Sequence, residues 1–195
     1  MTEVEIPNPE ELEELKGKKF TKHVALTTAI FAVMLAITSL GGNNAMKGML
    51  LAQQQASDQW AFYQSKVMRE HLYGTNKKII EALLLDRGGT MNAGTRRRYE
   101  ELGKQFDREE SRYREEKTGI ERAAKKLETD RDINNSKDPY FDYAEVLLQI
   151  AIVLASIAIL SGSHGVFYFS VLAAGIGSVL SLNGYLLLFR IPFFH

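Results

Sequence analysis

The sequence predicts an all-α integral membrane protein with three transmembrane helices and an antiparallel, coiled-coil-like helical hairpin between the first and the second. Residues 24–40 and 146–189 contain no Asp, Glu, Lys or Arg. Residues 41–142 hold 19 of the 24 Lys and Arg and 17 of the 24 Asp and Glu. Soluble proteins mix apolar and charged residues at helical or strand period, whereas membrane proteins separate them into blocks. The apolar runs are uninterrupted, so they lack the alternation typical of a β-barrel.

These blocks divide the 195-residue chain into six segments. The expected segments are an acidic then basic N-terminal segment (1–23), transmembrane helix 1 (24–40), the hairpin region (41–142), transmembrane helix 2 (143–161), transmembrane helix 3 (166–189) and a C-terminal tail (190–195).

The first apolar run is short for a transmembrane helix. Its 17 residues compare with the roughly 20 that a bilayer core about 30 Å thick requires. A cleaved signal peptide is the alternative. Six Glu before residue 15 and the lack of a small-x-small cleavage pattern after Leu40 favour a retained anchor.

The second and third apolar runs are separated only by residues 162–165, which predicts a tight antiparallel hairpin. Asp138 followed by Pro139 predicts the start of the second helix, with a carboxylate cap and a proline in the first turn. Aromatic and basic residues flank both runs, as in an interfacial belt. These residues are Tyr140, Phe141, Tyr143, Arg190, Phe193 and Phe194.

Small residues at helical spacing mark the faces through which these helices should pack. Small side chains allow close approach of helix backbones in lipid. On the second helix they are Ala151, Ala155 and Ala158, and on the third Ala173, Ala174, Gly177, Ser178, Ser181 and Gly184. Gln149 and Asn183 are polar positions inside the apolar runs. They either hydrogen-bond across a helix interface or line a pore or substrate path.

The charged region predicts two helices, at 43–85 and 96–132, joined by a turn rich in Gly and Asn. A seven-residue apolar row in the second helix predicts a coiled-coil seam. The row is Tyr99, Phe106, Tyr113, Ile120 and Leu127, with Leu102 and Ala123 in a companion row and Met49, Ala52, Ala56, Trp60, Tyr63 and Val67 on the first helix. Glu109 and Glu116 interrupt the companion row, so we expect the hairpin to be marginal and to gain stability from partners.

Neither catalytic nor cofactor chemistry is indicated by the residue pattern. There is no Cys, the four His are scattered, and the Gly88-Gly89-Thr90 stretch lacks the lysine and preceding strand of a phosphate loop. A net charge of zero gives no reason to expect nucleic-acid binding. We therefore expect no enzyme activity, no cofactor and no metal.

Residues 50–73 carry a specific pattern, with Ala56-Ser57-Asp58-Gln59-Trp60 at its centre and Tyr63 following. In this stretch, in the first span and in the closing hairpin, the chain resembles a bacterial membrane-protein family, domain of unknown function 4337. The resemblance implies one spanning helix, a helical middle and two closing spans, and it implies no activity. Residues 57–60 are either a partner-docking site or residues that pack in the coiled-coil seam and fix the register of that seam.

Lysines at the start of the first span predict the orientation in the membrane. Lys16, Lys18, Lys19 and Lys22 precede this span, and Lys47 alone falls in the twenty residues after it. The positive-inside rule then places the N-terminus in the cytoplasm and the hairpin in the periplasm of a bacterial inner membrane.

The predicted function is that of a non-enzymatic structural or interaction protein. It would contact membrane lipid and would self-associate or serve as an accessory subunit of a larger membrane complex. A passive oligomeric channel or transport protein is the alternative. The candidate interface residues are Ser57, Asp58, Gln59, Trp60, Tyr63, Gln149, Ala174, Gly177, Ser181 and Asn183.

Overall fold

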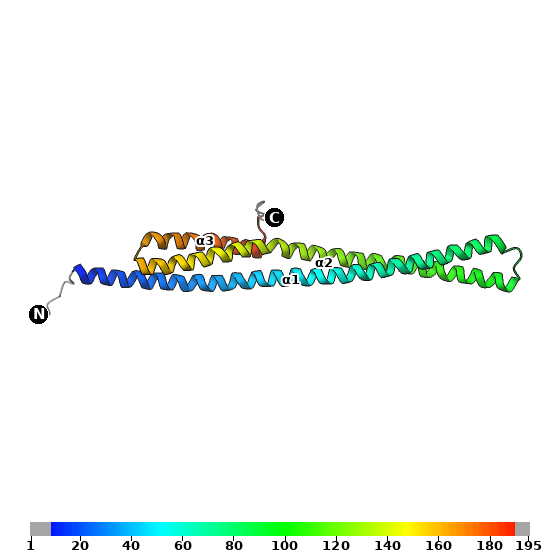
Figure 1. Ribbon diagram of the computed structural model, residues 1–195, viewed down its shortest axis with the longest axis horizontal. Coiled ribbons are helices and arrows are strands. Elements are labelled where there is room, and N and C mark those ends of the chain that lie inside the picture. The colour runs from blue at the N-terminus through cyan, green and yellow to red at the C-terminus, as the bar shows by residue number, and fades with distance from the viewer. Residues whose placement is uncertain (1–8, 190–195) are drawn as a thin grey trace. The chain divides into compact units, whose positions relative to one another are not determined.

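The computed structural model describes the backbone of residues 9–189 and the side chains of residues 17–189. Three helices, and no strand, are present in this part of the chain: α1 (Pro9–Arg87), α2 (Ala93–Ser161) and α3 (His164–Leu186) (Figure 1). The all-α prediction is confirmed. Each helix is long and apolar enough to cross a membrane. The N-terminal segment up to residue 8, the side chains through Lys16, and the tail with Arg190, Phe193 and Phe194 lie outside the described residues.

The helices contribute to two units. Unit 1 comprises Met1–Gly48 and Ile133–His195, and unit 2 comprises Met49–Asp132. Unit 1 contains the three apolar runs, and unit 2 contains most of the charged region.

The first span and the first hairpin helix are one continuous helix, because α1 runs from Pro9 to Arg87 without a break. The Gly41-Gly42 pair does not end the helix but allows a close approach. A Cβ added at Gly41 would lie 2.6 Å from both Phe141 Cε1 and Tyr185 Oη, and one at Gly42 would lie 3.2 Å from Phe141 Cβ. Glycine here makes room for the Phe141 ring, which is only 2% exposed.

The predicted helix start at Asp138-Pro139 is wrong, because Pro139 lies inside α2. Proline removes one helical hydrogen bond and usually disfavours a helix interior. Tertiary packing overrides this preference, since Tyr140, Phe141 and Ala144 just after it are all buried. Burial, together with repulsion from Asp142, raises the pKa of the Asp138 carboxyl.

Unit 1 is held together by small and medium-sized side chains between its three helices. Phe31 of α1 and Leu148 of α2 form one cluster with Ala151, Ala173 and Ala174. Ser170 Oγ donates to Ala151 O at 2.7 Å, which satisfies the buried hydroxyl. Large apolar side chains point outward instead, and Leu26, Val153 and Leu172 are each more than half exposed. This arrangement, small residues inside and large apolar residues outside, is typical of helices that pack in lipid.

The α2–α3 connection and the end of α3 are both capped. Gly162 adopts φ +65°, a left-handed conformation that favours glycine, and Ser163 caps α3 with its side chain accepting from Val166 N. The predicted third helix, 166–189, is shifted, since α3 begins at His164 and ends at Leu186. Leu187 leaves the helix at φ 48°, and its amide donates to Asn183 O at 2.7 Å.

Unit 2 is an antiparallel pair formed by the second half of α1 and the first half of α2. The connecting turn falls where Gly and Asn predicted it: Gly88 N donates to Leu84 O at 3.0 Å, and Asn92 Oδ1 caps α2 by accepting from Thr95 N at 2.8 Å. The companion row in α2 differs from the prediction, because Ala123 is exposed and Ala124 is fully buried.

Candidate interaction surface

The interior of unit 2 has a polar layer where the seam residues are charged. Glu70 lies at a seam position of α1 and its side chain is only 10% exposed. Arg114 Nε of α2 donates to Glu70 Oε1 at 3.1 Å, and Lys117 Nζ pairs with Glu70 Oε2 at 2.5 Å. Burial acts to raise the pKa of the Glu70 carboxyl, but the hydrogen bonds from Lys117 and Arg114 outweigh it, so this pKa lies below its ordinary value.

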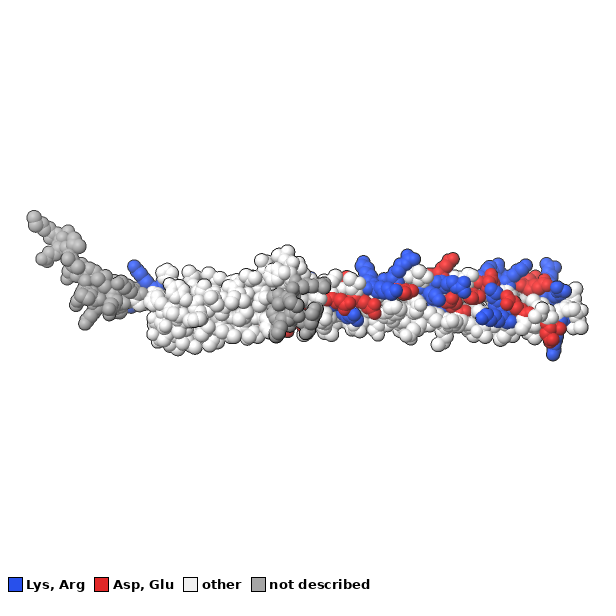
Figure 2. Space-filling view, turned by 90° about the horizontal axis from the view of Figure 1, so that it is seen from above, with Lys and Arg blue, Asp and Glu red and all other residues white. Residues whose placement is uncertain are grey.

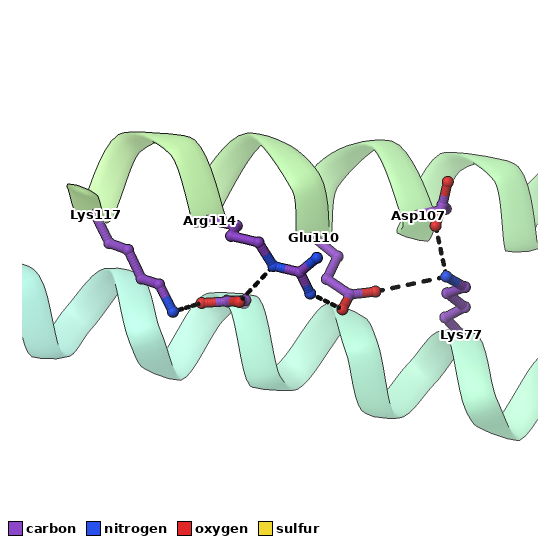
Figure 3. A network of polar contacts seen from close by, with 6 residues as sticks. Lys77, Asp107, Glu110, Arg114 and Lys117 are labelled. Atoms are coloured by element: carbon purple, nitrogen blue, oxygen red, sulfur yellow. Dashed lines mark hydrogen bonds and ion pairs between the residues drawn. The ribbon is translucent and has the colours of Figure 1, made fainter. Parts of the chain in front are cut away.

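The same network continues toward the turn (Figure 3). Arg114 Nη2 also donates to Glu110 Oε1 at 2.8 Å, while Lys77 Nζ of α1 contacts Asp107 Oδ1 at 2.5 Å and Glu110 Oε2 at 3.7 Å. Alternating charges therefore link the two helices over several turns. These pairs fix which residues of α1 and α2 face each other.

Tyr113, 5% exposed, is the most buried aromatic residue of unit 2. Its ring stacks on Tyr73 with centroids 5.6 Å apart, and its hydroxyl accepts from Arg112 Nη2 at 2.9 Å and from Arg69 Nη1 at 3.5 Å. Lys66 Nζ lies 5.2 Å from the ring centroid. The hydrogen bond from Arg69, assisted by Arg112, lowers the pKa of the Tyr113 hydroxyl.

The two glutamates expected to weaken the seam are both paired with cations. Lys66 Nζ donates to Glu116 Oε2 at 2.6 Å, and Arg112 Nη2 pairs with Glu109 Oε2 at 2.7 Å. The companion row is thus interrupted by ion pairs rather than by unpaired carboxylates. The sequence does not predict the ion pairs between the two helices, because the spacing of charged residues within one helix does not show which residues of the other helix lie opposite. Glu70, seven residues after Tyr63, was the available signal.

Residues 56–60, which carry the sequence resemblance, lie partly inside and partly on the surface of unit 2. Ala56 is buried, Gln59, Trp60 and Tyr63 are half-buried, and Ser57 and Asp58 are exposed. Trp60 Nε1 donates to Glu128 Oε1 of α2 at 2.9 Å, and its ring meets Tyr63 edge to face at 5.4 Å. Trp60 therefore links the two helices and Tyr63 packs beside it on α1, while Ser57 and Asp58 are available to another molecule.

Trp60→Phe is expected to loosen this end of unit 2 by about 1 kcal/mol, since it removes a hydrogen bond to a half-buried carboxylate. Hydrogen exchange of the full chain in detergent should show faster exchange of amides near residues 60 and 128. Ser57→Ala on the exposed side is the control and should leave exchange unchanged. Equal exchange in both variants would mean that the Trp60–Glu128 contact contributes nothing.

The outward side of α1 in unit 2 is nearly uncharged. Ten exposed positions follow one another at three- and four-residue steps, the spacing of a helix-packing seam. We call them the outer row: Leu51, Gln54, Asp58, Ala61, Ser65, Met68, Leu72, Thr75, Ile79 and Ala82. Asp58 is the single charge among them. All ten side chains are exposed, and Met68 is 74% exposed, so no other part of unit 2 covers this row.

The corresponding outward positions of α2 are mostly charged. They are Arg98, Glu101, Gln105, Arg108, Arg112, Glu115, Gly119, Arg122, Lys126 and Thr129. In unit 2, whose residues are all described, every large apolar side chain that is exposed lies on α1 and none lies on α2. Figure 2 shows the consequence: the charged side chains of unit 2 gather along one side and leave the other mostly uncharged.

The remaining candidate residues lie in unit 1, and most of them are internal. Ala174, Gly177 and Ser181 are buried, and the Oγ atoms of Ser181 and Thr38 of α1 lie 2.8 Å apart. They face the other helices of the same chain. A cross-helix role for Gln149 is not found: it is exposed, and its Nε2 lies 3.5 Å from Glu145 Oε1 of its own helix.

Asn183, expected to bond across a helix interface, instead closes the end of its own helix. Its Nδ2 donates to Phe189 O at 2.8 Å, and its Oδ1 accepts from Phe189 N at 3.1 Å. The side chain is 1% exposed. Both polar groups of the amide are satisfied by the backbone just after α3, so Asn183 holds that segment in place.

Comparison with known sequences identifies the family. The family described as a domain of unknown function, DUF4337, matches residues 20–187. The chain belongs to the DUF4337 family. No significant match was found among curated proteins or among solved structures. The DUF4337 match includes residues of both units, and therefore both the outer row and the buried small residues of unit 1.

Proposed function

We propose that this DUF4337 chain is a non-enzymatic membrane protein that self-associates through the outer row of α1. In this proposal unit 1 lies in a bacterial inner membrane and unit 2 lies in water. Lys18, Lys19 and Lys22, before the first apolar run, favour a cytoplasmic N-terminus and a periplasmic unit 2.

The membrane assignment is supported by the surface of unit 1. The apolar runs of its three helices have mean hydropathies of 2.1, 2.2 and 1.8. Large apolar side chains are exposed on each helix, among them Val33, Val153 and Phe169. Exposed apolar surface of this extent is unfavourable in water and favourable in hydrocarbon.

The observation that carries self-association is the contrast between the outward faces of α1 and α2. Two copies inserted in the same bilayer point the same way, so a two-fold axis along the membrane normal brings each residue of a helix close to the same residue of its partner. On α2 such pairing would place Arg against Arg and Glu against Glu, which is destabilising. On α1 it would place Leu51, Leu72 and Ile79 against themselves, as in a parallel two-stranded seam.

Asp58 is the exception in the outer row, and it has a role in this arrangement. A charged or polar residue at a seam position lowers the stability of a helix pair but can fix its register and its number of strands. Asp58 is fully outward on α1, beside Ser57. We infer that it specifies the alignment of the two copies.

Single cysteines test the proposal directly, because the chain contains none. Leu72→Cys, in the outer row, is expected to form a disulfide-linked dimer when membranes containing the full-length protein are oxidised. Equivalent seam positions in parallel helix pairs come within the roughly 7 Å between Cα atoms that a disulfide allows. The readout is a non-reducing gel.

Thr118→Cys is the matched control, since it is equally exposed but lies on the charged outward side of α2. It should remain predominantly monomeric. Equal dimer from both positions would indicate random collision and would contradict the proposal. Cross-linking of Leu72→Cys only to other proteins would assign the outer row to a different subunit and would also contradict self-association.

A further inference from the structure

Near the start of α1, unit 1 has an open hollow of about 1100 Å³ formed by all three helices. Residues of α1 from Gly17 to His23 form one wall. Ile159, Leu160 and Ser161 of α2, together with Gly162 and His164, form the rest. Its size is that of a site for a sizeable small molecule.

The lining combines a lysine and two histidines with apolar surface. Lys19, His23 and His164 contribute nitrogen groups, Thr21 and Ser161 contribute hydroxyls, and no Asp or Glu is among the described residues that line the hollow. Such a set of groups favours an anion over a cation.

Aromatic packing holds part of this lining in place. The Phe20 ring stacks on the His164 imidazole with centroids 4.1 Å apart, and it meets Phe167 edge to face at 5.9 Å. His23 Nδ1 donates to Lys19 O at 2.7 Å. The contact between Phe20 and His164 joins α1 to the start of α3, so the hollow is bounded by packed elements.

The hollow lies where the apolar runs of the three helices end. The charge-free run of α1 begins at Val24, α2 ends at Ser161, and α3 begins at His164. In a bilayer this is the level of the head groups. Leu160, 88% exposed, adds apolar surface beside the lysine and the histidines. A ligand that fits has an anionic group attached to hydrocarbon.

We propose that this hollow binds an anionic phospholipid, with its phosphate at Lys19 and His164 and its acyl chains against Leu160. The inference rests on the proposed insertion of unit 1 in a membrane. The proposed site differs from a general attraction of lysines to anionic lipid, because only one face of α1, the face that lines the hollow, contacts the lipid.

A second hollow on α1 supplies the control. It is about 520 Å³, and Lys18, Lys22, Thr21 and Ala25 line it together with Gly17. This hollow involves α1 alone, without imidazole or aromatic groups. Lys22 therefore carries the same charge as Lys19, one turn away, outside the proposed site.

Native mass spectrometry of the full-length protein in detergent tests the proposal. The protein is mixed with phosphatidylglycerol and phosphatidylcholine of the same acyl chains. The unmodified protein is expected to retain phosphatidylglycerol by roughly tenfold over phosphatidylcholine, a preference of the size that one good ionic contact supplies. Lys19→Gln and His164→Gln should each remove most of this preference, and Lys22→Gln should retain it.

Equal losses in Lys19→Gln and Lys22→Gln would overturn the proposal, because diffuse charge would then explain the preference. Displacement of the lipid by millimolar inorganic phosphate would also overturn it, since the hollow would then be a site for the free anion. A detergent-held protein without lipid preference refutes this inference alone. A protein that is soluble without detergent refutes the membrane insertion on which it rests.

Discussion

Gly177→Leu is expected to disrupt the packing of α3 against α2, whereas Gly175→Leu, two residues earlier, is expected to be tolerated. A Cβ at Gly177 would lie 3.1 Å from Ala144 O, 3.2 Å from Leu147 Cβ and 3.2 Å from Leu148 Cγ. Backbone and branched side chains cannot move aside easily, and a leucine adds three further carbons beyond that Cβ. Overpacking of this kind costs about 1–3 kcal/mol, and more when backbone must shift.

Thermal unfolding of the full chain in detergent, followed by circular dichroism, would measure the effect. Gly175 is exposed, and a Cβ added there would meet nothing within 4 Å, so Gly175→Leu makes the same change in helix propensity without the collision. The expected result is a lower melting temperature for Gly177→Leu only. Equal melting temperatures would show that α3 does not pack against α2 through Gly177.

The stripe of small residues shows what the sequence can and cannot predict about helix packing. Small residues at four-residue spacing predict a helix interface, and Ala151, Ala174 and Gly177 are indeed buried. The spacing contains no information on which helix is the neighbour. In the structure these residues face other helices of the same chain. The surface proposed for a second molecule is the outer row of α1, whose apolar residues are separated by Gln, Ser and Thr and so resemble a solvated face.

Gly41, Gly42 and Pro139 lie inside helices for a common physical reason. Glycine and proline weaken an isolated helix by about 1 and 3 kcal/mol respectively. Each of these residues lies close to Phe141, in space or along the chain, and the burial of Phe141 compensates for the weakness. The seven-residue row that starts at Tyr99 likewise continues past the predicted boundary, through Asn134, Phe141, Leu148 and Ala155. Composition changes at the boundary, but the period does not.

The buried ion pair in unit 2 leads to the second large expected effect: Glu70→Gln should destabilise unit 2 at neutral pH. Glutamine is uncharged, so it cannot neutralise the positive charges of Lys117 and Arg114, which both contact the Glu70 carboxylate. Removing the charge of the buried carboxylate leaves the two cations without their partner. Because Arg114 is mostly in water, we expect the lower range for a lost charged hydrogen bond, about 1–3 kcal/mol.

The destabilisation should depend on pH in a defined direction. The pKa of Glu70 in the folded chain lies below its ordinary value of 4.5, so its stabilisation is complete above pH 4.5 and is lost as the pH falls through the folded-state pKa. Asp107 and Glu116 also have lowered pKa values. A lower pH therefore reduces the stability of both the wild type and the Glu70→Gln variant. The difference between wild type and Glu70→Gln isolates Glu70, and it should shrink toward acid pH.

Trp60 makes the measurement straightforward, because it is the single tryptophan of the chain and lies in unit 2. Urea unfolding of the full-length protein in detergent, followed by tryptophan fluorescence at neutral and acid pH, reports the stability of this unit. Glu100→Gln is the control, since Glu100 pairs with Arg96 on the exposed surface of its own helix, at 3.1 Å, and such pairs contribute little. A difference between wild type and Glu70→Gln that stays constant down to acid pH would mean that Glu70 acts through its shape and not through its charge.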